Sequence, residues 1–463
     1  MNRPIRVYLC LSASLIVSAA CVLRTPQPTV APAALVPSST PLPSPTATIV
    51  VTPSPTRPSV TATPRPTLPQ TDVDAETTAR HRRIFEQVWT TVNTQYVYPD
   101  FNGANWDAIH AEYGARIDRG LSDEDFWQAM AEMIDQLGDD HSSFLPPSEA
   151  REQDSQLQGN LTYAGIGIYA AAQAEKQQAV IFIVFPGSPA DAAGLRAHDT
   201  ILAINGQPII NADGSDNLDR LRGLPGTRVT VTIRSPGASP REVSLSRARV
   251  DGALRVTGRT LLIEPGARRL GYILIPTLWD AHIAATARET LIDLTSAGPL
   301  DGLILDLRVN GGGTSTNLLA LSAFFTEGAR GEFVSRDESR PLEVTPEPIG
   351  NSQGVPLVIL ISEDTESYAE VFSGVLLEAG RAQLVGRPSA GNVETVYGYD
   401  FEDGSRAWIA RETFIPPSGD RWENAGLTPS VRVEQTWDEF TDANDPAIAA
   451  AVDLLTRPAS QPR

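Results

Sequence analysis

The sequence predicts an α/β fold whose main layer is a mostly parallel sheet, preceded by a helical segment and a β-rich module. Beyond Leu270, short apolar runs alternate with runs of helical spacing, an order typical of parallel strands joined by helices. The expected strands are residues 272–275, 303–307 and 357–361, and the expected helices are 283–294, 314–325, one that starts near 367, and 446–455. Upstream, residues 74–155 show helical spacing, and residues 156–250 contain alternating strand-like runs.

Composition sets limits on the function. With 463 residues and 41% hydrophobic content, the chain can bury more than one core. A net charge of -19 argues against nucleic acid and anionic membrane surfaces as partners. Both cysteines, Cys10 and Cys21, stand near the start, so the folded part has no disulfide and no cysteine-based metal site or nucleophile. We expect neither a metal nor a cofactor.

The first 21 residues are typical of an export signal. Arg3 and Arg6 precede an apolar segment, residues 7–17, that is too short for a comfortable membrane span, and small residues follow it. Cys21, directly after these small residues, is similar to the lipobox of bacterial lipoproteins. That resemblance implies cleavage, lipidation of Cys21 and anchoring to the outer face of the cell membrane. Ser18 replaces the leucine that the motif prefers, so an ordinary secretory signal is the alternative.

Residues 22–73 are rich in proline and threonine and cannot form a core. Prolines favour extended conformations, and the segment could act as a stalk of up to roughly 150 Å at about 3.1 Å per residue. The alternative is a linker with no spacing role, and the sequence does not separate the two.

The helical segment, residues 74–155, ends in a polar loop, Leu137-Gly138-Asp139-Asp140-His141-Ser142-Ser143. The next segment, residues 156–250, contains the runs Pro186-Gly187-Ser188-Pro189-Ala190 and Asp199-Thr200-Ile201-Leu202-Ala203-Ile204-Asn205-Gly206, which resemble a PDZ domain. The loop with Gly165, Ile166 and Gly167 then matches the loop that binds a peptide's terminal carboxylate through backbone N–H groups.

The final segment, residues 251–463, holds the candidate nucleophile. Ser367 follows the apolar run 357–361 and a polar turn, and it opens a run of helical spacing. A serine there is either a helix N-cap or a hydroxyl placed at the positive end of a helix dipole. Upstream, Asp306-Leu307-Arg308-Val309-Asn310-Gly311-Gly312-Gly313 exposes backbone N–H groups between a strand and a helix, which suits an oxyanion; a plain turn is the alternative.

Together, the Asp306 run, the Ser367 stretch, the PDZ-like module and the His141 loop resemble the family of C-terminal processing and tricorn-core peptidases, family S41. The resemblance implies a crotonase-like α/β core in which Ser367 attacks a peptide carbonyl. It also implies an oxyanion hole formed by the N–H of Tyr368 and that of Gly312 or Gly313. Tyr368 departs from the small residue usual at its position.

The family uses two kinds of base. Processing peptidases use a lysine, but Asn392 stands at that position here, and an amide cannot accept a proton from serine. Lys176 is the only lysine and lies in a polar turn, where we expect a solvated charge. The tricorn-like branch uses a histidine oriented by a glutamate, which the resemblance assigns to His141 and Glu423.

The sequence therefore predicts an exported serine endopeptidase that recognises protein substrates by their free C-termini. The alternative, favoured by the missing lysine, is a catalytically inactive protein that binds peptides through its PDZ groove. We expect the chain's partners to be proteins or peptides and a membrane reached through Cys21, with no nucleic acid.

Overall fold

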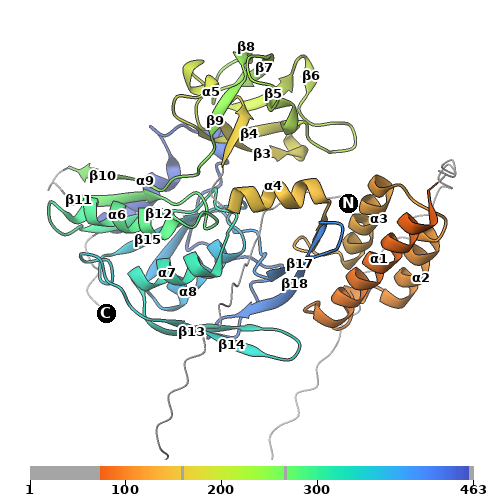
Figure 1. The fold of residues 1–463 in the computed structure, drawn as a ribbon. Coiled ribbons are helices and arrows are strands. Elements are labelled where there is room, and N and C mark those ends of the chain that lie inside the picture. The colour runs from red at the N-terminus through yellow and green to blue at the C-terminus, as the bar shows by residue number, and fades with distance from the viewer. Residues whose placement is uncertain (1–72, 158–160, 265–267, 458–463) are drawn as a thin grey trace, which may run out of the picture. The chain divides into compact units, whose positions relative to one another are not determined.

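The structure is a computed structural model that describes residues 73–157, 161–264 and 268–457 (Figure 1). The expected export signal, Cys21 and the proline-rich linker lie outside the described residues. Within those residues, no helix has the length and apolar character needed to cross a membrane.

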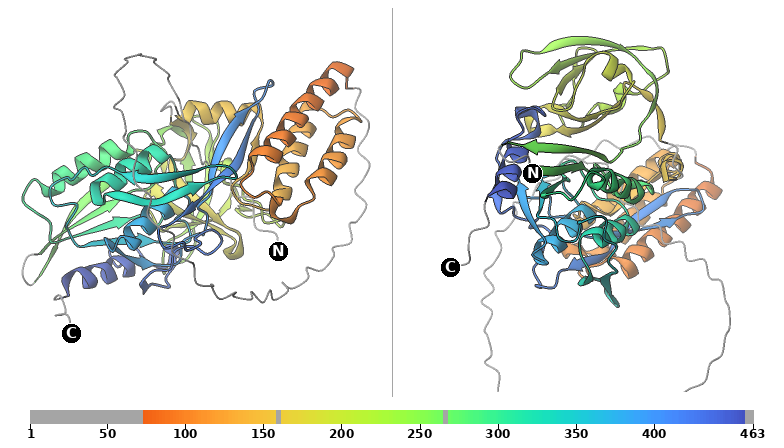
Figure 2. Two further views of the ribbon diagram at one scale, coloured as in Figure 1. Left: turned by 90° about the horizontal axis from the view of Figure 1, so that it is seen from below. Right: turned by 90° about the vertical axis from the view of Figure 1, so that its left-hand side faces the viewer.

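The N-terminal segment is helical, as predicted, and its first three helices pack side by side (Figure 2). Ser122 begins the third helix, where its Oγ accepts a hydrogen bond of 3.1 Å from the N–H of Asp125. Phe85 of the first helix and Phe126 of the third are fully buried in one apolar cluster between the helices. The helices are α1 (Ala75–Gln95), α2 (Trp106–Ile117), α3 (Asp123–Ile134) and α4 (Pro147–Leu157), with 3-10 turns at Phe101–Gly103 and Asp135–Leu137.

The β-rich segment forms a six-stranded antiparallel sheet and a separate two-stranded one. The predicted strand 228–234 is observed with the same bounds, and its alternate residues are buried because only one face meets the module's core. Strand β3 pairs only with β4 among the described strands, so it is an edge strand. The strands are β2 (Thr162–Gly165), β3 (Ile168–Gln173), β4 (Gln178–Val184), β5 (Thr200–Ile204), β6 (Gln207–Pro208), β7 (Arg228–Arg234), β8 (Arg241–Ser246) and β9 (Ala248–Asp251); the helical turns are α5 (Pro189–Ala192), Ala174–Lys176 and Leu218–Leu221.

The main layer is a six-stranded sheet in the order β10-β11-β12-β15-β16-β19, parallel except for the β10–β11 pair. Helices α6, α7 and α8 cover one face and α9 covers the other, so its central strands are buried on both faces (Figure 1). The elements are β10 (Thr257–Ile263), β11 (Arg268–Leu274), α6 (Ile283–Thr295), β12 (Gly302–Asp306), α7 (Ser315–Phe325), β15 (Leu357–Ile361), α8 (Tyr368–Glu378), β16 (Ala382–Gly386), β19 (Val431–Arg432), the 3-10 turn Trp437–Glu439 and α9 (Pro446–Thr456).

The α/β fold class is confirmed, with its helical segment, β-rich module and peptidase-type core. A second, antiparallel sheet was not predicted; it comprises β1 (Ser143–Leu145), β13 (Gly328–Val334), β14 (Ser339–Val344), β17 (Thr395–Asp400) and β18 (Arg406–Ile415). In it, Phe144 of β1 pairs with Ala407 of β18. This register fixes the loop before β1, which carries His141, against a strand far along the chain.

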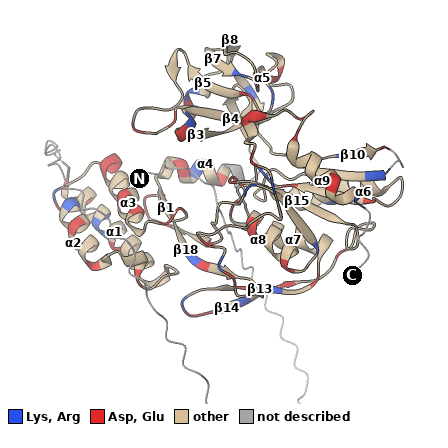
Figure 3. Cartoon of the chain, turned by 180° about the vertical axis from the view of Figure 1, so that it is seen from behind, with Lys and Arg blue, Asp and Glu red and all other residues tan. Residues whose placement is uncertain are grey.

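The described surface carries acidic residues on each of its parts. Acidic residues occur on the helical segment, the β-rich module and the core alike (Figure 3), in line with the negative net charge.

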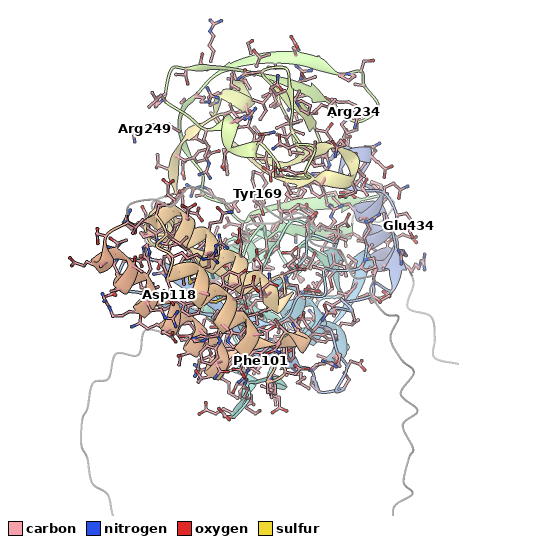
Figure 4. The ribbon with its side chains drawn as sticks, turned by 90° about the vertical axis from the view of Figure 1, so that its right-hand side faces the viewer. Phe101, Asp118, Tyr169, Arg234, Arg249 and Glu434 are labelled. Atoms are coloured by element: carbon pink, nitrogen blue, oxygen red, sulfur yellow. The ribbon has the colours of Figure 1, made fainter. Side chains whose placement is uncertain are left out.

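Val180 and Phe182 of β4 pack with Val309 in a buried cluster, and Tyr169, labelled in Figure 4, packs against it. The β-rich module therefore contacts the segment that leads into the glycine run.

Candidate active site

Ser367 lies between β15 and α8 with an unusual backbone conformation. Its φ of 54° and ψ of -130° are costly for a residue with a side chain, on the order of 1–3 kcal/mol. Neighbouring hydrogen bonds hold this geometry: the N–H of Ser367 donates to the carbonyl of Asn392 at 2.7 Å, and that of Glu366 donates to the carbonyl of Asn310 at 3.0 Å. The serine makes no capping hydrogen bond to the helix. Ser367 therefore stands at the N-cap position of α8, but its hydroxyl does not cap the helix.

The glycine run lies directly against Ser367. A Cβ added to Gly312 would stand 2.6 Å from the Cβ of Ser367, and one added to Gly313 would stand 2.0 Å from the carbonyl carbon of Leu278. Gly312 and Gly313 also have φ values of +87° and +155°, which favour glycine. Only residues without a side chain let these two segments approach so closely.

The two glycines differ in what their N–H groups do. The N–H of Gly312 donates to Oδ1 of Asn310 at 2.9 Å, so it is already engaged. The N–H groups of Gly313 and Tyr368 donate to no acceptor among the residues that the structure describes. The pair of uncommitted donors beside Ser367 is therefore Gly313 and Tyr368.

A buried ionic network anchors the start of the glycine run. Arg308 contacts Asp306, at the end of β12, and Asp445, at the N-terminus of α9, at 2.6 Å each. Burial alone would lower the pKa of Arg308, but Asp306 and Asp445 outweigh burial and raise the pKa. The guanidinium also lies over the ring of Trp437, 4.9 Å from its centroid. Arg308 is thus a charged, fully paired support and not a free group for substrate.

Asp139 shapes the loop that presents His141. Its Oδ1 accepts the N–H of His141 at 3.0 Å and that of Ser142 at 2.6 Å. Its Oδ2 accepts the hydroxyl of Ser142 at 3.0 Å, and this hydroxyl in turn accepts the N–H of Ala410 on β18 at 3.1 Å. The loop is thereby tied to the antiparallel sheet, and His141 has little freedom.

His141 faces two carboxylates. Its Nε2 lies 3.7 Å from Oε2 of Glu394 and 3.8 Å from Oε2 of Glu423, and the side chains of His141 and Glu394 are only 3% and 2% exposed. Burial alone would lower the pKa of His141, but Glu423, Glu394 and Asp139 outweigh it and raise the pKa to about 9. Burial raises the pKa of Glu394 to about 7, against the attraction of His141. His141 is therefore predominantly protonated at neutral pH in this arrangement.

The segment Asn392-Val393-Glu394 joins Ser367 to the histidine. The carbonyl of Asn392 accepts the Ser367 N–H, the N–H of Val393 donates to Oε2 of Glu423 at 2.8 Å, and Glu394 reaches His141. No hydrogen bond joins the hydroxyl of Ser367 to His141. Ser367, His141 and Glu423 thus all lie around the segment 392–394, but the hydroxyl of Ser367 is not hydrogen-bonded to His141.

Two carboxylates of the site were missed by sequence reasoning. Glu394 stands two residues after Asn392, and Glu370 stands one helical turn after Ser367, a spacing that could have drawn attention to it. Glu370 is fully buried and accepts hydrogen bonds from the Ser389 hydroxyl and the N–H groups of Gly391 and Asn392. It fixes the segment that holds Ser367.

Lys176 lies in an exposed turn, as expected, and it also forms an ion pair there. Its Nζ donates to Thr436 Oγ1 at 2.7 Å and to Asp438 Oδ1 at 2.9 Å, and its side chain is 33% exposed. The sequence could not predict these two partners, because they lie about 260 residues further along the chain. The other histidines pair outside the site: His81 with Asp123, His110 with Glu86, His198 with Asp442 and His282 with Asp280.

The candidate carboxylate-binding loop leads into the edge strand β3. Gly167 has a φ of +88°, and a Cβ there would stand 2.2 Å from the Cβ of Ser188. The hydroxyl of Tyr163 accepts the N–H of Ile168 at 3.2 Å, whereas the N–H of Ile166 meets no acceptor in the described part of the chain. Gly165 ends β2, and a Cβ there would stand 2.8 Å from the Tyr163 ring.

Comparison with known proteins agrees with this arrangement. Residues 269–433 match peptidase family S41, residues 77–135 match the tricorn protease C1 domain, and residues 184–235 match the PDZ domain. The chain carries an S41 peptidase domain. By this similarity it is a serine-type peptidase.

Named relatives of this S41 peptidase are processing enzymes. The chloroplastic C-terminal processing peptidase of Tetradesmus obliquus is 28% identical over 376 residues, covering 78% of this chain and 79% of the relative. The carboxyl-terminal-processing protease of Synechocystis sp. is 28% identical over 382 residues, covering 81% and 87%.

Solved structures show the same fold. The photosystem II D1 C-terminal processing protease superposes with a TM-score of 0.57 at 25% identity, covering 76% of this chain and 93% of that one. A putative S41 protease from Bacteroides fragilis gives 0.53 at 16% identity, covering 80% and 97%, and this likeness concerns the fold alone.

Proposed function

We propose that this S41 peptidase is an exported serine endopeptidase that acts on proteins recognised by their C-termini, with Ser367 as nucleophile, His141 as base and Glu423 as the group that orients the base. The observation that carries the proposal is the contact of His141 with Glu423, beside a serine whose backbone is held in a strained turn. Asn392 occupies the position that a lysine fills in processing peptidases, so histidine is the base available here.

In the proposed reaction, the imidazole nitrogen of His141 that does not face the carboxylates accepts the proton of Ser367 as its oxygen attacks the peptide carbonyl. Glu423 stabilises the imidazolium that forms. His141 then gives the proton to the leaving amine, and water hydrolyses the acyl-enzyme by the reverse proton transfers. Substrate binding must bring Ser367 and His141 into hydrogen-bond reach, as catalytic contacts often tighten only in the enzyme–substrate complex.

The negative oxygen formed on the substrate carbonyl needs donors near Ser367. We assign this role to the N–H groups of Tyr368 and Gly313, which are uncommitted. Gly312, the other candidate from the sequence, supports Asn310 instead.

Substrate recognition is assigned to the PDZ domain. Backbone N–H groups of the Gly165-Ile166-Gly167 loop would bind a terminal carboxylate, and the edge strand β3 would pair with the peptide. The names of the processing relatives are consistent with action at C-termini. The boundaries predicted for the helical, PDZ and peptidase segments stay predictions.

Export and lipidation of Cys21 belong to the same proposal. A basic start, a short apolar segment and Cys21 after small residues support it. In a bacterial host, wild-type protein should incorporate labelled palmitate and Cys21→Ala should not; equal labelling of the two would exclude Cys21 as the lipidated residue.

The test of the enzyme itself is labelling with a fluorophosphonate, combined with cleavage of an unfolded protein substrate. Wild type and Ser148→Ala, which alters an exposed serine on α4, should label and cleave. Ser367→Ala should fold and do neither. Full cleavage by Ser367→Ala would refute the assigned nucleophile.

A further inference from the structure

The cluster of His141, Glu394 and Glu423 contains buried polar atoms without hydrogen bonds. Nε2 of His141 and Oε2 of Glu394 are both inaccessible and unpartnered. At 3.7 and 3.8 Å, the separations of Nε2 from the two carboxylate oxygens are too long for hydrogen bonds. Buried polar atoms in native proteins nearly always have a hydrogen-bond partner, so these two atoms point to a ligand that binds between them.

The same three side chains present one ligand atom each within 4.8 Å of one another. Two carboxylates and one imidazole can neutralise a divalent cation that is held between them. We propose that His141, Glu394 and Glu423 form a zinc-binding site, and that zinc bound there inhibits the peptidase.

The choice of zinc follows from the donors. Zinc is bound by imidazole nitrogen and carboxylate oxygen at about 2.0–2.2 Å, commonly by three protein ligands with a fourth position open. Donors arranged tetrahedrally at that distance are about 3.3 Å apart. Nε2 of His141 therefore needs to approach each carboxylate by only a few tenths of an ångström. Calcium and magnesium prefer more numerous oxygen ligands, so they fit poorly.

The surroundings hold the ligands in place. Oε2 of Glu423 accepts the N–H of Val393 at 2.8 Å, and the His141 loop is fixed by Asp139. Hydrogen bonds of this kind orient metal ligands. The inhibitory consequence rests on the proposed function. A zinc ion bound to Nε2 of His141 would leave the ring proton on Nδ1, the nitrogen assigned to accept the proton of Ser367, so His141 could not act as base.

Binding is tested separately from catalysis, on the full chain carrying Ser367→Ala. Zinc is titrated against a chromophoric indicator, with magnesium and calcium as comparison ions. We expect one zinc per chain and at least about tenfold weaker binding after Glu394→Gln. Glu343→Gln, the same change at an exposed position on β14, should bind as the parent does. Circular dichroism checks that each variant is folded. Equal zinc affinity in folded Glu394→Gln and Glu343→Gln would overturn the site.

Inhibition is then measured on the active enzyme. Zinc should inhibit, EDTA should restore the rate, and Glu394→Gln should need at least about tenfold more zinc, relative to its own zinc-free rate. An active enzyme unaffected by saturating zinc, or one that loses activity with EDTA, would overturn the inhibitory role. Zinc binding that depends on Glu394 in a protein without peptidase activity would support the site and refute the proposed function instead.

Discussion

The carbonyl oxygen of Asn392 accepts a hydrogen bond from the N–H of Ser367 at 2.7 Å. The residue at the family's lysine position therefore does touch the nucleophile's residue, but through its backbone. Its side-chain Oδ1 is buried and unpartnered and has no basic character. Asn392 therefore supports the backbone of Ser367 and offers no base, in agreement with the proposal that His141 accepts the proton.

The first prediction compares the two candidate bases. His141→Ala should lower kcat/KM by at least about 10³-fold, because removal of a triad base leaves only binding and the oxyanion hole. Lys176→Ala should stay within about threefold, because Lys176 pairs with Asp438 on a partly exposed surface. Steady-state cleavage of one peptide decides between them; an active His141→Ala would show that the base is misassigned.

Glu423→Gln is the matched change for the orienting group in the same assay. It keeps the size of the side chain and removes the charge beside Nε2 of His141. We expect a loss of kcat, because the imidazolium formed during attack loses its partner. An unchanged kcat would leave Glu423 a structural residue only.

The second prediction concerns pH. An isolated histidine, with a pKa near 6.5, would give activity rising through pH 6–7. Here the two carboxylates raise the pKa of His141 to about 9, so the neutral, proton-accepting form is reached only in the alkaline range. In metal-free buffer with EDTA, kcat/KM should rise up to about pH 9. A plateau already reached at pH 7 would contradict this.

The variant Glu394→Gln tests the cause of that shift. Removing a negative charge destabilises the imidazolium, so the pKa of His141 should fall and the rise in activity should move to lower pH. A role of Glu394 in structure alone would lower activity at every pH without moving the profile. The control Glu343→Gln should retain the wild-type profile.

The sequence was most informative where structure is local. The apolar run 357–361 predicted a strand, and β15 has those bounds. The helical spacing after Ser367 predicted a helix, and α8 is observed there. The antiparallel sheet was missed because its strands pair across long sequence separations. Phe144 pairs with Ala407, and the local sequence around either residue does not indicate its partner strand. Glu394 escaped notice for the same reason, since only the folded chain brings it to His141. Likewise, that Gly312 is committed to Asn310 depends on a side-chain conformation that composition cannot give.

The third prediction concerns the PDZ loop. If backbone N–H groups around Ile166 bind a terminal carboxylate, then amidation of a peptide's C-terminus should weaken binding to Ser367→Ala protein by about tenfold or more. Fluorescence anisotropy of one labelled peptide in acid and amide forms measures this. Gly167→Ala should abolish the difference, because its Cβ would clash with Ser188 at a φ of +88°. Equal affinity of both peptides for the parent protein would rule the role out.

The last prediction concerns Glu370, whose carboxylate joins the nucleophile's helix to the segment behind it. Oε1 accepts the hydroxyl of Ser389 at 2.5 Å and the N–H of Gly391 at 2.8 Å, while Oε2 accepts the N–H of Asn392 at 2.7 Å. Burial raises the pKa of Glu370 to about 7, because the carboxylate loses its hydration, and the three hydrogen bonds offset part of that loss. In Glu370→Gln, an amide NH₂ must face at least one of these donors, which costs about 1–3 kcal/mol.

Because Asn392 holds the backbone of Ser367, this change should act on both stability and rate. We expect Tm to fall by about 2–4 °C for each kcal/mol lost, and kcat to fall while KM changes little. Glu343→Gln makes the same chemical change on an exposed strand and should leave both quantities as they are. Thermal unfolding and steady-state kinetics on the two variants provide the comparison. If Glu370→Gln unfolds and turns over like wild type, the Ser389–Asn392 segment is held by other contacts, and the alignment of Ser367 does not depend on this carboxylate.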